Sequence, residues 1–268
     1  PLPVLLRFTI PLLLGNLFQQ FYNMADTIIV GRYVGAGALA AVGSTGALIN
    51  LLINVFIGLS VGVNVLVAQY YGAKREQDVN ETVHTAVAIS LLSGVFLVAL
   101  GLLVTRPLLE LMGTPDDVID KSAIYMKIYF AGMPATMLYN FGSAVLRAVG
   151  DTRRPLYFLT AAGVVNVVLN LFFVISLNMD VAGVALATVI SQVGSCAFVL
   201  AFLFGSKPHV RITFSGYDVR VMRRVLLIGF TPFAIIAVDN VMIIAMNAVL
   251  QQYGGPGRGD LLITCNTI

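Results

Sequence analysis

Residues 8–35, FTIPLLLGNLFQQFYNMADTIIVGRYVG, decide the fold class of this chain. The stretch is apolar enough to lie in a bilayer, but four polar residues recur in it at steps of three, four and three: Asn16, Gln19, Asn23 and Asp26. That spacing places them on one face of a helix. A charged side chain at the centre of a membrane costs about 3 kcal/mol or more, so such residues normally face a protein interior or a water-filled cavity. The stretch predicts a membrane-spanning helix with a functional polar face, and Asp26 is its leading candidate.

The composition of the whole chain is that of a helical membrane protein. Of its 268 residues, 58% are hydrophobic and 11% are charged, whereas soluble domains average about 25% charged residues. The charges fall between apolar runs, each long enough for a spanning helix of about 20 residues. This pattern favours a helical bundle over a β-barrel with its alternating strands. The net charge of +3 follows from the positive-inside rule, so no nucleic-acid partner is expected.

The sequence offers little for enzymatic chemistry. Its two cysteines and two histidines are well separated and have no partner at metal-ligand spacing: Cys196, Cys265, His84 and His209. No Ser-His-Asp arrangement can be argued from the sequence. We therefore expect no enzyme and no cofactor, and we interpret the two cysteines as packing residues.

Seven apolar spans and the start of an eighth follow one another along the chain. The seven cover residues 5–34, 44–71, 82–104, 122–149, 156–177, 181–204 and 225–253. The longest polar stretch lies between the sixth span and the seventh. We expect an N-terminal six-helix transmembrane lobe (1–205), a cytoplasmic inter-lobe linker (206–224) and the start of a C-terminal lobe (225–268). The chain is thus expected to be a fragment of a longer protein.

The lysines and arginines predict the orientation in the membrane. If the N-terminus is cytoplasmic, 11 of the 16 basic residues fall on the inner side. These are Arg7, Lys74, Arg75, Arg147, Arg153, Arg154, Lys207, Arg211, Arg220, Arg223 and Arg224. The excess supports an inner N-terminus. We expect a multi-pass, monomeric protein of the cell membrane whose partners are the lipid bilayer and small molecules.

Later spans carry polar residues whose role the pattern leaves open. Asn166 and Asn170 are four residues apart and share one face of an otherwise apolar helix. Thr188 lies in the next span and Asp239 in the seventh. Side chains of this kind often serve helix packing. From the residues alone, packing and a polar site are equally open interpretations of the two asparagines, and Asp239 is equally ambiguous.

Four stretches resemble one family, the multidrug and toxic compound extrusion (MATE) transporters, and within it the bacterial DinF- and MepA-like branch. They are residues 8–35, LRAVGDTRRPL at 146–156, NVVLNLFFV at 166–174 and GVALATVISQ at 183–192. The resemblance implies a MATE-like helical bundle, a twelve-helix antiporter of which this chain holds one six-helix lobe and the start of the second. It also implies export of cationic or amphipathic compounds in exchange for protons or sodium ions.

The resemblance assigns roles to individual residues. It implies an ion- or proton-coupling cluster of Asp26, Tyr125, Asn166, Asn170 and Thr188, of which all but Tyr125 are candidate sodium ligands. The family's fifth-span motif usually reads Asn-x-x-Leu-Asp, and this chain has Asn170 in place of the second acid. Asp26 would then carry the charge change alone, because desolvation disfavours its charged form and lets it take up a proton.

A substrate cavity is expected near the cluster, with candidate lining residues Asn16, Gln19, Asn23, Tyr139 and Asp239. Two other functions stay open at this point. A lipid-linked oligosaccharide flippase of the same superfamily would show a basic cavity within the spans, whereas the lysines and arginines here lie near the span ends. A membrane enzyme would show clustered His, Asp or Glu at a membrane face, and the sequence lacks such a cluster.

Overall fold

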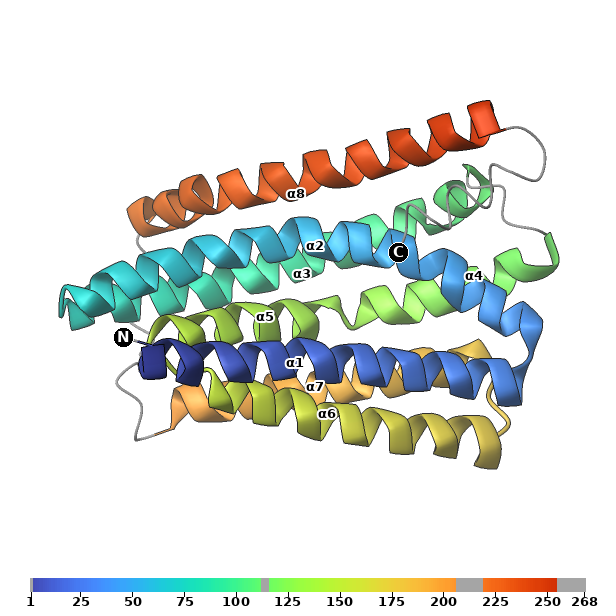
Figure 1. The fold of residues 1–268 in the computed structure, drawn as a ribbon, viewed down its shortest axis with the longest axis horizontal. Coiled ribbons are helices and arrows are strands. Elements are labelled where there is room, and N and C mark those ends of the chain that lie inside the picture. The colour runs from blue at the N-terminus through green and yellow to red at the C-terminus, as the bar shows by residue number, and fades with distance from the viewer. Residues whose placement is uncertain (1, 112–115, 206–218, 255–268) are drawn as a thin grey trace.

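The computed structural model describes residues 2–111, 116–205 and 219–254 of the chain (Figure 1). The elements in these ranges are all helical: α1 (Leu2–Ile29), η1 (Val30–Val34), α2 (Ala36–Gly72), α3 (Glu76–Leu111), α4 (Asp116–Ala131), α5 (Met133–Ala148), α6 (Arg153–Leu171), η2 (Phe172–Ser176), α7 (Val181–Phe204) and α8 (Val219–Gly254). η1 and η2 are π-helical turns that continue α1 and α6. The predicted all-α fold class is confirmed.

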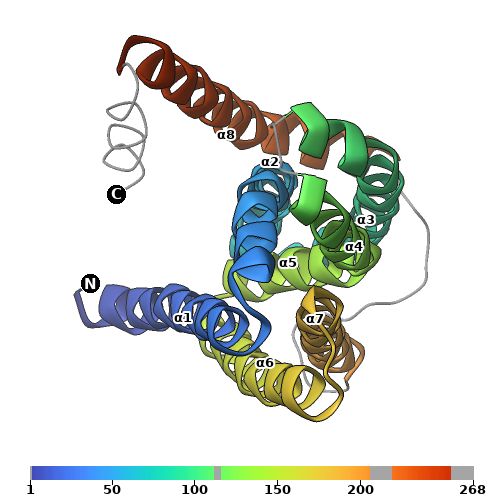
Figure 2. The ribbon, with the colours of Figure 1, turned by 90° about the vertical axis from the view of Figure 1, so that its right-hand side faces the viewer.

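The helices lie side by side along one axis and form an elongated bundle (Figures 1 and 2). α2 contacts α3, α4, α5 and α8, whereas α1 contacts α6, and α6 contacts α7. Viewed along the axis, α8 lies on the opposite side of α2 from α1 (Figure 2). The first and the last described helices are therefore separated by the middle of the bundle.

The outer surface of the bundle is apolar. Leucines on two different helices are largely exposed: Leu92 (66%) and Leu103 (76%) of α3, and Leu227 (61%) of α8. Five segments are long and apolar enough to cross a membrane: Leu52–Gly72, Glu76–Glu110, Arg153–Ser176, Val181–Phe204 and Val219–Asp239. Lipid tails are the solvent that such a surface requires, since its exposure to water is unfavourable. The chain is therefore a multi-pass membrane protein.

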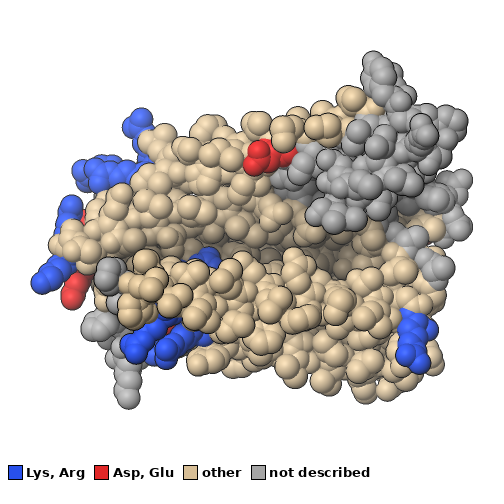
Figure 3. Space-filling model, in the orientation of Figure 1, with Lys and Arg blue, Asp and Glu red and all other residues tan. Residues whose placement is uncertain are grey.

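Basic side chains gather at the end of the bundle where the N-terminus lies (Figure 3). The α2–α3 and α5–α6 connections and the start of α8 lie at this same end (Figure 1). In the described part of the chain they contribute Lys74, Arg75, Arg147, Arg153, Arg154, Arg220, Arg223 and Arg224. The structure thus keeps the charge asymmetry on which the predicted orientation depends.

The predicted span 122–149 consists of two helices, α4 and α5, that meet at Gly132. Pro134, near the start of α5, has no N–H to continue the hydrogen-bond ladder and crowds the preceding turn, which interrupts the helix. The Gly132 N–H donates to the Tyr129 carbonyl at 3.0 Å. A β-carbon added at Gly94 of α3 would lie 2.5 Å from the Pro134 Cα. The break between α4 and α5 therefore packs closely against α3, because Gly94 has no side chain.

α8 is held on α2 by a close crossing of glycines. A β-carbon added at Gly62 would lie 2.5 Å from the Val225 carbonyl oxygen and 2.6 Å from the Gly229 nitrogen. One added at Gly58 would lie 2.8 Å from the Phe233 backbone. This is the close helix contact that a small-xxx-small pair permits. It begins early in α8, whose first turns include residues 219–224 of the expected linker.

Some sequence-based expectations lie outside the described residues. They concern the start of the eighth span, most of the linker, and the residues Lys207, His209, Arg211 and Cys265. The other cysteine and the other histidine of the chain, Cys196 and His84, are both buried.

Candidate functional site

The carboxylate of Asp26 lies where α1, α6 and α7 meet. The Asn170 side-chain nitrogen donates to Asp26 Oδ1 at 2.5 Å. With its amide oriented to satisfy its neighbours, Asn166 donates to the same oxygen at 2.7 Å. Thr188 Oγ1 of α7 lies 3.3 Å from the amide oxygen of Asn166 in that orientation. The structure thus brings together four residues that the sequence singled out, and we call Asp26, Asn166, Asn170 and Thr188 the coupling cluster.

The coupling cluster is shielded by the surrounding helices. Asn170 is 0% exposed and Asn166 is 2% exposed, while Asp26 is half-buried. Asn166 and Asn170 reach Asp26 together because they are one helical turn apart on α6. The oxygen Asn170 Oδ1 is buried and has no hydrogen-bond donor among the described residues. Leaving such an acceptor unpaired costs about 1–3 kcal/mol, so this oxygen is suited to an additional donor or a cation.

The oxygens of the coupling cluster form a donor set for a hard cation. Carboxylate, amide and hydroxyl oxygens are the ligands that hard cations prefer. No group of three or more His, Cys, Asp or Glu side chains suited to a metal ion occurs within residues 2–111, 116–205 and 219–254. In the described orientation, however, both amides turn their nitrogens toward the carboxylate. A sodium ion at Asp26 would therefore require at least one amide to turn its oxygen inward.

Two π-helical turns directly follow the residues of the coupling cluster. η1 begins at Val30, after Asp26 on α1, and η2 begins at Phe172, after Asn170 on α6. The two turns contact each other, and both contact α7. π-helical turns interrupt the regular ladder and are frequent at functional sites. Sequence reasoning missed them, because no residue type marks a π-turn in an apolar run.

Asp26 opens onto a cavity of about 350 Å³, which we call the outer cavity because it lies on the side away from the basic end. Tyr125, the fifth residue of the expected cluster, lines this cavity together with Thr188. Its ring lies 6.1 Å from the Tyr129 ring, between centroids. Within the described part of the chain, the Tyr125 hydroxyl makes no hydrogen bond to Asp26. Tyr125 is therefore a wall of the cavity rather than a direct partner of the carboxylate.

A second cavity, of about 260 Å³, extends toward the basic end, and we call it the inner cavity. Four of the five expected lining residues are found in its wall: Asn16, Gln19, Asn23 and Tyr139. Further amides complete the wall, from Asn50, Asn54, Asn140 and Gln192. The two cavities share the lining residues Tyr22, Asn23, Asn50 and Tyr129. A hollow between the helices is visible in the space-filling view (Figure 3).

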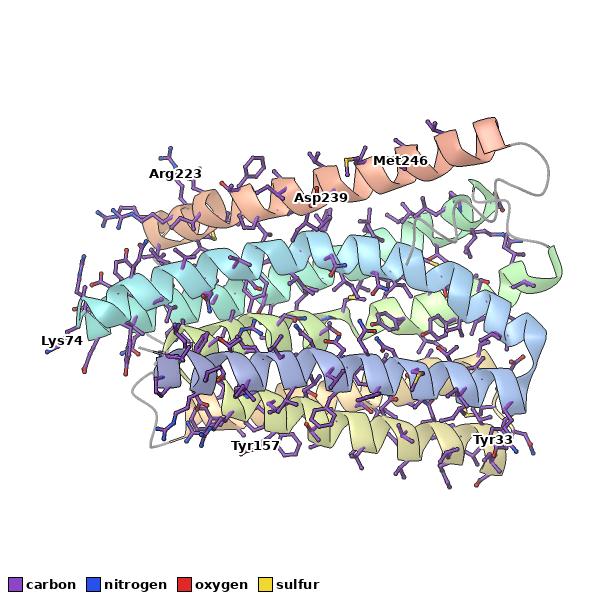
Figure 4. All side chains as sticks on the ribbon, viewed as in Figure 1. Tyr33, Lys74, Tyr157, Arg223, Asp239 and Met246 are labelled. Carbon is purple, nitrogen blue, oxygen red and sulfur yellow. The ribbon has the colours of Figure 1, made fainter. Side chains whose placement is uncertain are left out.

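Asp239, the fifth expected lining residue, is not part of either cavity. It is exposed on α8, which packs against α2 and α3, whereas Asp26 lies on α1 (Figure 4). The structure does not bring Asp239 together with the other four expected residues, because the glycine crossing holds α8 on the far side of α2. Hydropathy and spacing could not place α8 relative to α1.

Arg147 lies near the end of its span, as expected of the basic residues, but it also takes part in a cavity wall. It is in the last turn of α5, half-buried, and it lines the inner cavity. The charge pattern of the sequence predicts only that Arg147 lies on the inner side, not that it lines a cavity. The available signal was its helical register, because Thr136, Asn140 and Arg147 follow at steps of four and seven and all line this cavity.

These features define a class of protein: a helical membrane protein with polar cavities and a desolvated carboxylate inside its bundle, which is the architecture of a transporter. The MatE family model matches residues 11–172 of the chain. The chain therefore belongs to the MATE transporter family. The family resemblance drawn from the sequence is confirmed, as is the expectation that the chain is not an enzyme.

Individual proteins agree with this assignment. The chain is 32% identical to the probable multidrug resistance protein YoeA of Bacillus subtilis, over 90% of this chain and 53% of YoeA. It is 27% identical to an FAD transporter of Shewanella oneidensis, over 70% of this chain and 42% of that protein. The structure of a MOP superfamily transporter from Pyrococcus furiosus superimposes with a TM-score of 0.90 at 26% identity, covering 98% of this chain and 58% of that one. The chain thus spans about half the length of the curated relatives that it matches.

Proposed function

We propose that this chain is the N-terminal lobe and the first helix of the second lobe of a secondary antiporter. The antiporter exports small amphipathic compounds in exchange for protons or sodium ions. The observation that carries this proposal is the coupling cluster, in which Asp26 is held by Asn166 and Asn170 while it opens onto the outer cavity. Membership of the MATE family supports the same function.

The hydrogen bonds of Asp26 suggest how an ion could be coupled to movement. Two N–H groups from α6 point at the carboxylate, which suits its charged form. A proton on Asp26 removes the negative charge, so the two bonds that Oδ1 accepts change from charge-assisted bonds to weaker neutral ones. Because these bonds tie α1 to α6, the two states of Asp26 favour different positions of α1. Such a difference in interaction energy is what exchange between two conformations requires.

Sodium is the alternative coupling ion. The oxygens of Asp26, Asn166, Asn170 and Thr188 would hold it, and the buried, unpaired Asn170 Oδ1 supports this assignment. A bound sodium ion would neutralise the carboxylate as a proton does. With Asn170 in place of a second acid, the cluster offers one negative charge, so we expect a weaker cation site than a pair of carboxylates would form.

The substrate class and the membrane orientation are also proposals. Family membership does not fix the substrate, since the relatives above are named for multidrug resistance and for FAD transport. An oligosaccharide flippase is not favoured, because the chain belongs to the MATE family. We propose that the protein lies in the plasma membrane. The basic end of the bundle, with the N-terminus, then faces the cytoplasm. The inner cavity then faces the compartment from which substrate is taken, and we expect the protein to act as a monomer.

The test uses the full-length protein in proteoliposomes with an imposed proton or sodium gradient. Uptake of two fluorescent compounds, ethidium and dansylglycine, is compared for the wild type, Asp26→Asn and Asp239→Asn. Asp239→Asn is the matched control, since it removes a carboxylate on a membrane helix outside both cavities. We expect gradient-driven uptake to fall to the gradient-free rate in Asp26→Asn and to persist in Asp239→Asn. Undiminished uptake in Asp26→Asn would overturn the role of the carboxylate.

A further inference from the structure

The inner cavity has an unusual charge for a site expected to take cations. Among its lining residues in the described chain, Arg147 is the single charged side chain, and no carboxylate is present. The other polar groups are neutral amides and hydroxyls, contributed by Asn16, Gln19, Asn23, Asn50, Asn54, Asn140, Gln192, Tyr22, Tyr129, Tyr139, Thr136 and Thr152. An organic cation would therefore find no counter-charge in this wall.

The charge of Arg147 is not neutralised within the described residues. Neither an ion pair nor a hydrogen bond joins its guanidinium group to another side chain there. The neighbouring acid, Asp151, is ion-paired with Arg154 at 2.5 Å. Charges that are shielded from water are normally paired. A half-buried guanidinium in a cavity wall is therefore an incomplete interaction that an anion could complete.

Arg147 also differs from the arginines that anchor the same end of the bundle. Arg153 and Arg154 are exposed, and neither lines the inner cavity. A surface anchor keeps its charged group in water or among lipid headgroups. Arg147 instead contributes to the wall that Tyr139 and Gln192 share. Membrane anchoring thus accounts for the two exposed arginines and leaves Arg147 unexplained.

We propose that the inner cavity binds the anionic group of an amphipathic organic anion, a carboxylate or a phosphate, on Arg147. This inference rests on the proposed export function and names the substrate class of the inner cavity. A guanidinium group presents several N–H donors in a plane, which matches the oxygens of either group. The surrounding amides add neutral donors, while the rings of Tyr22, Tyr129 and Tyr139 offer apolar surface to the rest of the molecule.

Equilibrium binding tests the proposal without any ion gradient. Three fluorescent probes share the dansyl group and differ in charge: dansylglycine (carboxylate), dansyl-aminoethyl phosphate (phosphate) and dansylcadaverine (cation). Anisotropy titrations on the purified full-length protein are compared for the wild type, Arg147→Gln, Arg147→Lys and the exposed control Arg153→Gln. The first two probes show which anionic group the site prefers.

We expect the wild type to bind both anionic probes more tightly than dansylcadaverine. Arg147→Gln should weaken the anionic probes by about tenfold or more, the effect of losing a charge-assisted hydrogen bond, and leave dansylcadaverine unaffected. Arg147→Lys should retain part of the affinity, and Arg153→Gln should match the wild type. The proposal is overturned if Arg147→Gln leaves the anionic probes unchanged, or if it weakens all three probes equally.

A second variant keeps the test decisive if Arg147→Gln does not fold. Gln192→Glu places a carboxylate in the same cavity wall, where it should weaken the anionic probes and strengthen dansylcadaverine. The opposite result would contradict the proposal. Because binding needs no gradient, the anion preference can fail while Asp26-dependent transport holds, and the reverse can also occur. Failure of this inference is thus distinguishable from failure of the proposed function.

Discussion

The outer and the inner cavity differ in the charge that each contains and in how the protein holds that charge. In the outer cavity, Asp26 is bonded by two amides of α6. In the inner cavity, Arg147 has no such partner in the described chain, although amides are abundant around it. A charge with built-in partners suits a group that changes state within the protein. A charge without them suits a group that binds a ligand, so the comparison supports the proposed division between ion coupling at Asp26 and substrate binding at Arg147.

The largest expected effect tests how strongly Asp26 is held. Asn170→Leu removes a donor at 2.5 Å from a shielded carboxylate, and we expect a loss of about 2–3 kcal/mol of stability, as for hydrogen bonds to charged groups. Thermal unfolding of the purified protein in detergent measures it. Gln20→Leu, an exposed change on α1 outside both cavities, is the control. A loss no greater than the control's would show that the amide does not hold the carboxylate.

The next effect concerns α2, which lines both cavities. At Gly62 an added β-carbon would meet the backbone of α8 at 2.5 Å, so Gly62→Ala should destabilise the protein by about 1–2 kcal/mol through overpacking. Gly37→Ala on the same helix has nothing within 4 Å of the new carbon and should be tolerated. Thermal unfolding compares the two variants, and equal stabilities would contradict the close crossing of α2 and α8.

A smaller effect tests the single charge of the coupling cluster. Asn170→Asp places a second carboxylate beside Asp26, which should strengthen sodium binding because two acids attract a cation better than one. We expect the sodium concentration that gives half-maximal uptake in proteoliposomes to fall by about tenfold. Asn178→Asp, at an exposed position between η2 and α7, is the control for added charge. An unchanged sodium response would place residue 170 outside the ion site.

The smallest effect tests whether the two charges act independently. Asp26→Asn should change dansylglycine affinity by less than about twofold, because the carboxylate lines only the outer of the two cavities and residues without a shared partner usually act additively. Anisotropy titration of the purified variant measures this. A change in affinity as large as that caused by Arg147→Gln would show that the two cavities act as one binding site.

Much of this arrangement was predictable from residue spacing. The stripe through Asp26 and the pair Asn166 and Asn170 stand out because polar residues at helical steps are rare in apolar spans. Their meeting with Thr188 was expected from the family resemblance and is seen in the structure. The apolar runs likewise predicted the order of the described helices, although the span 122–149 is divided into α4 and α5.

Other features depend on tertiary contacts that spacing does not encode. Asp239 is a carboxylate in an apolar span, as a site residue would be, but the packing of α8 on Gly58 and Gly62 places it outside the cavities. Arg147 has the position of an anchor, but the register of α5 turns it into the inner cavity. The helix break at Gly132 can be predicted from the nearby proline, whereas the packing of this break against α3 cannot be predicted from the sequence.

The most direct test of the account measures gradient-driven dansylglycine uptake at varied concentration for the wild type, Asp26→Asn and Arg147→Gln. If Asp26 couples the ion and Arg147 binds substrate, Asp26→Asn lowers the maximal rate to the gradient-free level and keeps the half-saturating concentration within about twofold. Arg147→Gln instead raises that concentration about tenfold and keeps the stimulation by the gradient. Loss of gradient stimulation in Arg147→Gln, together with its survival in Asp26→Asn, would contradict the account.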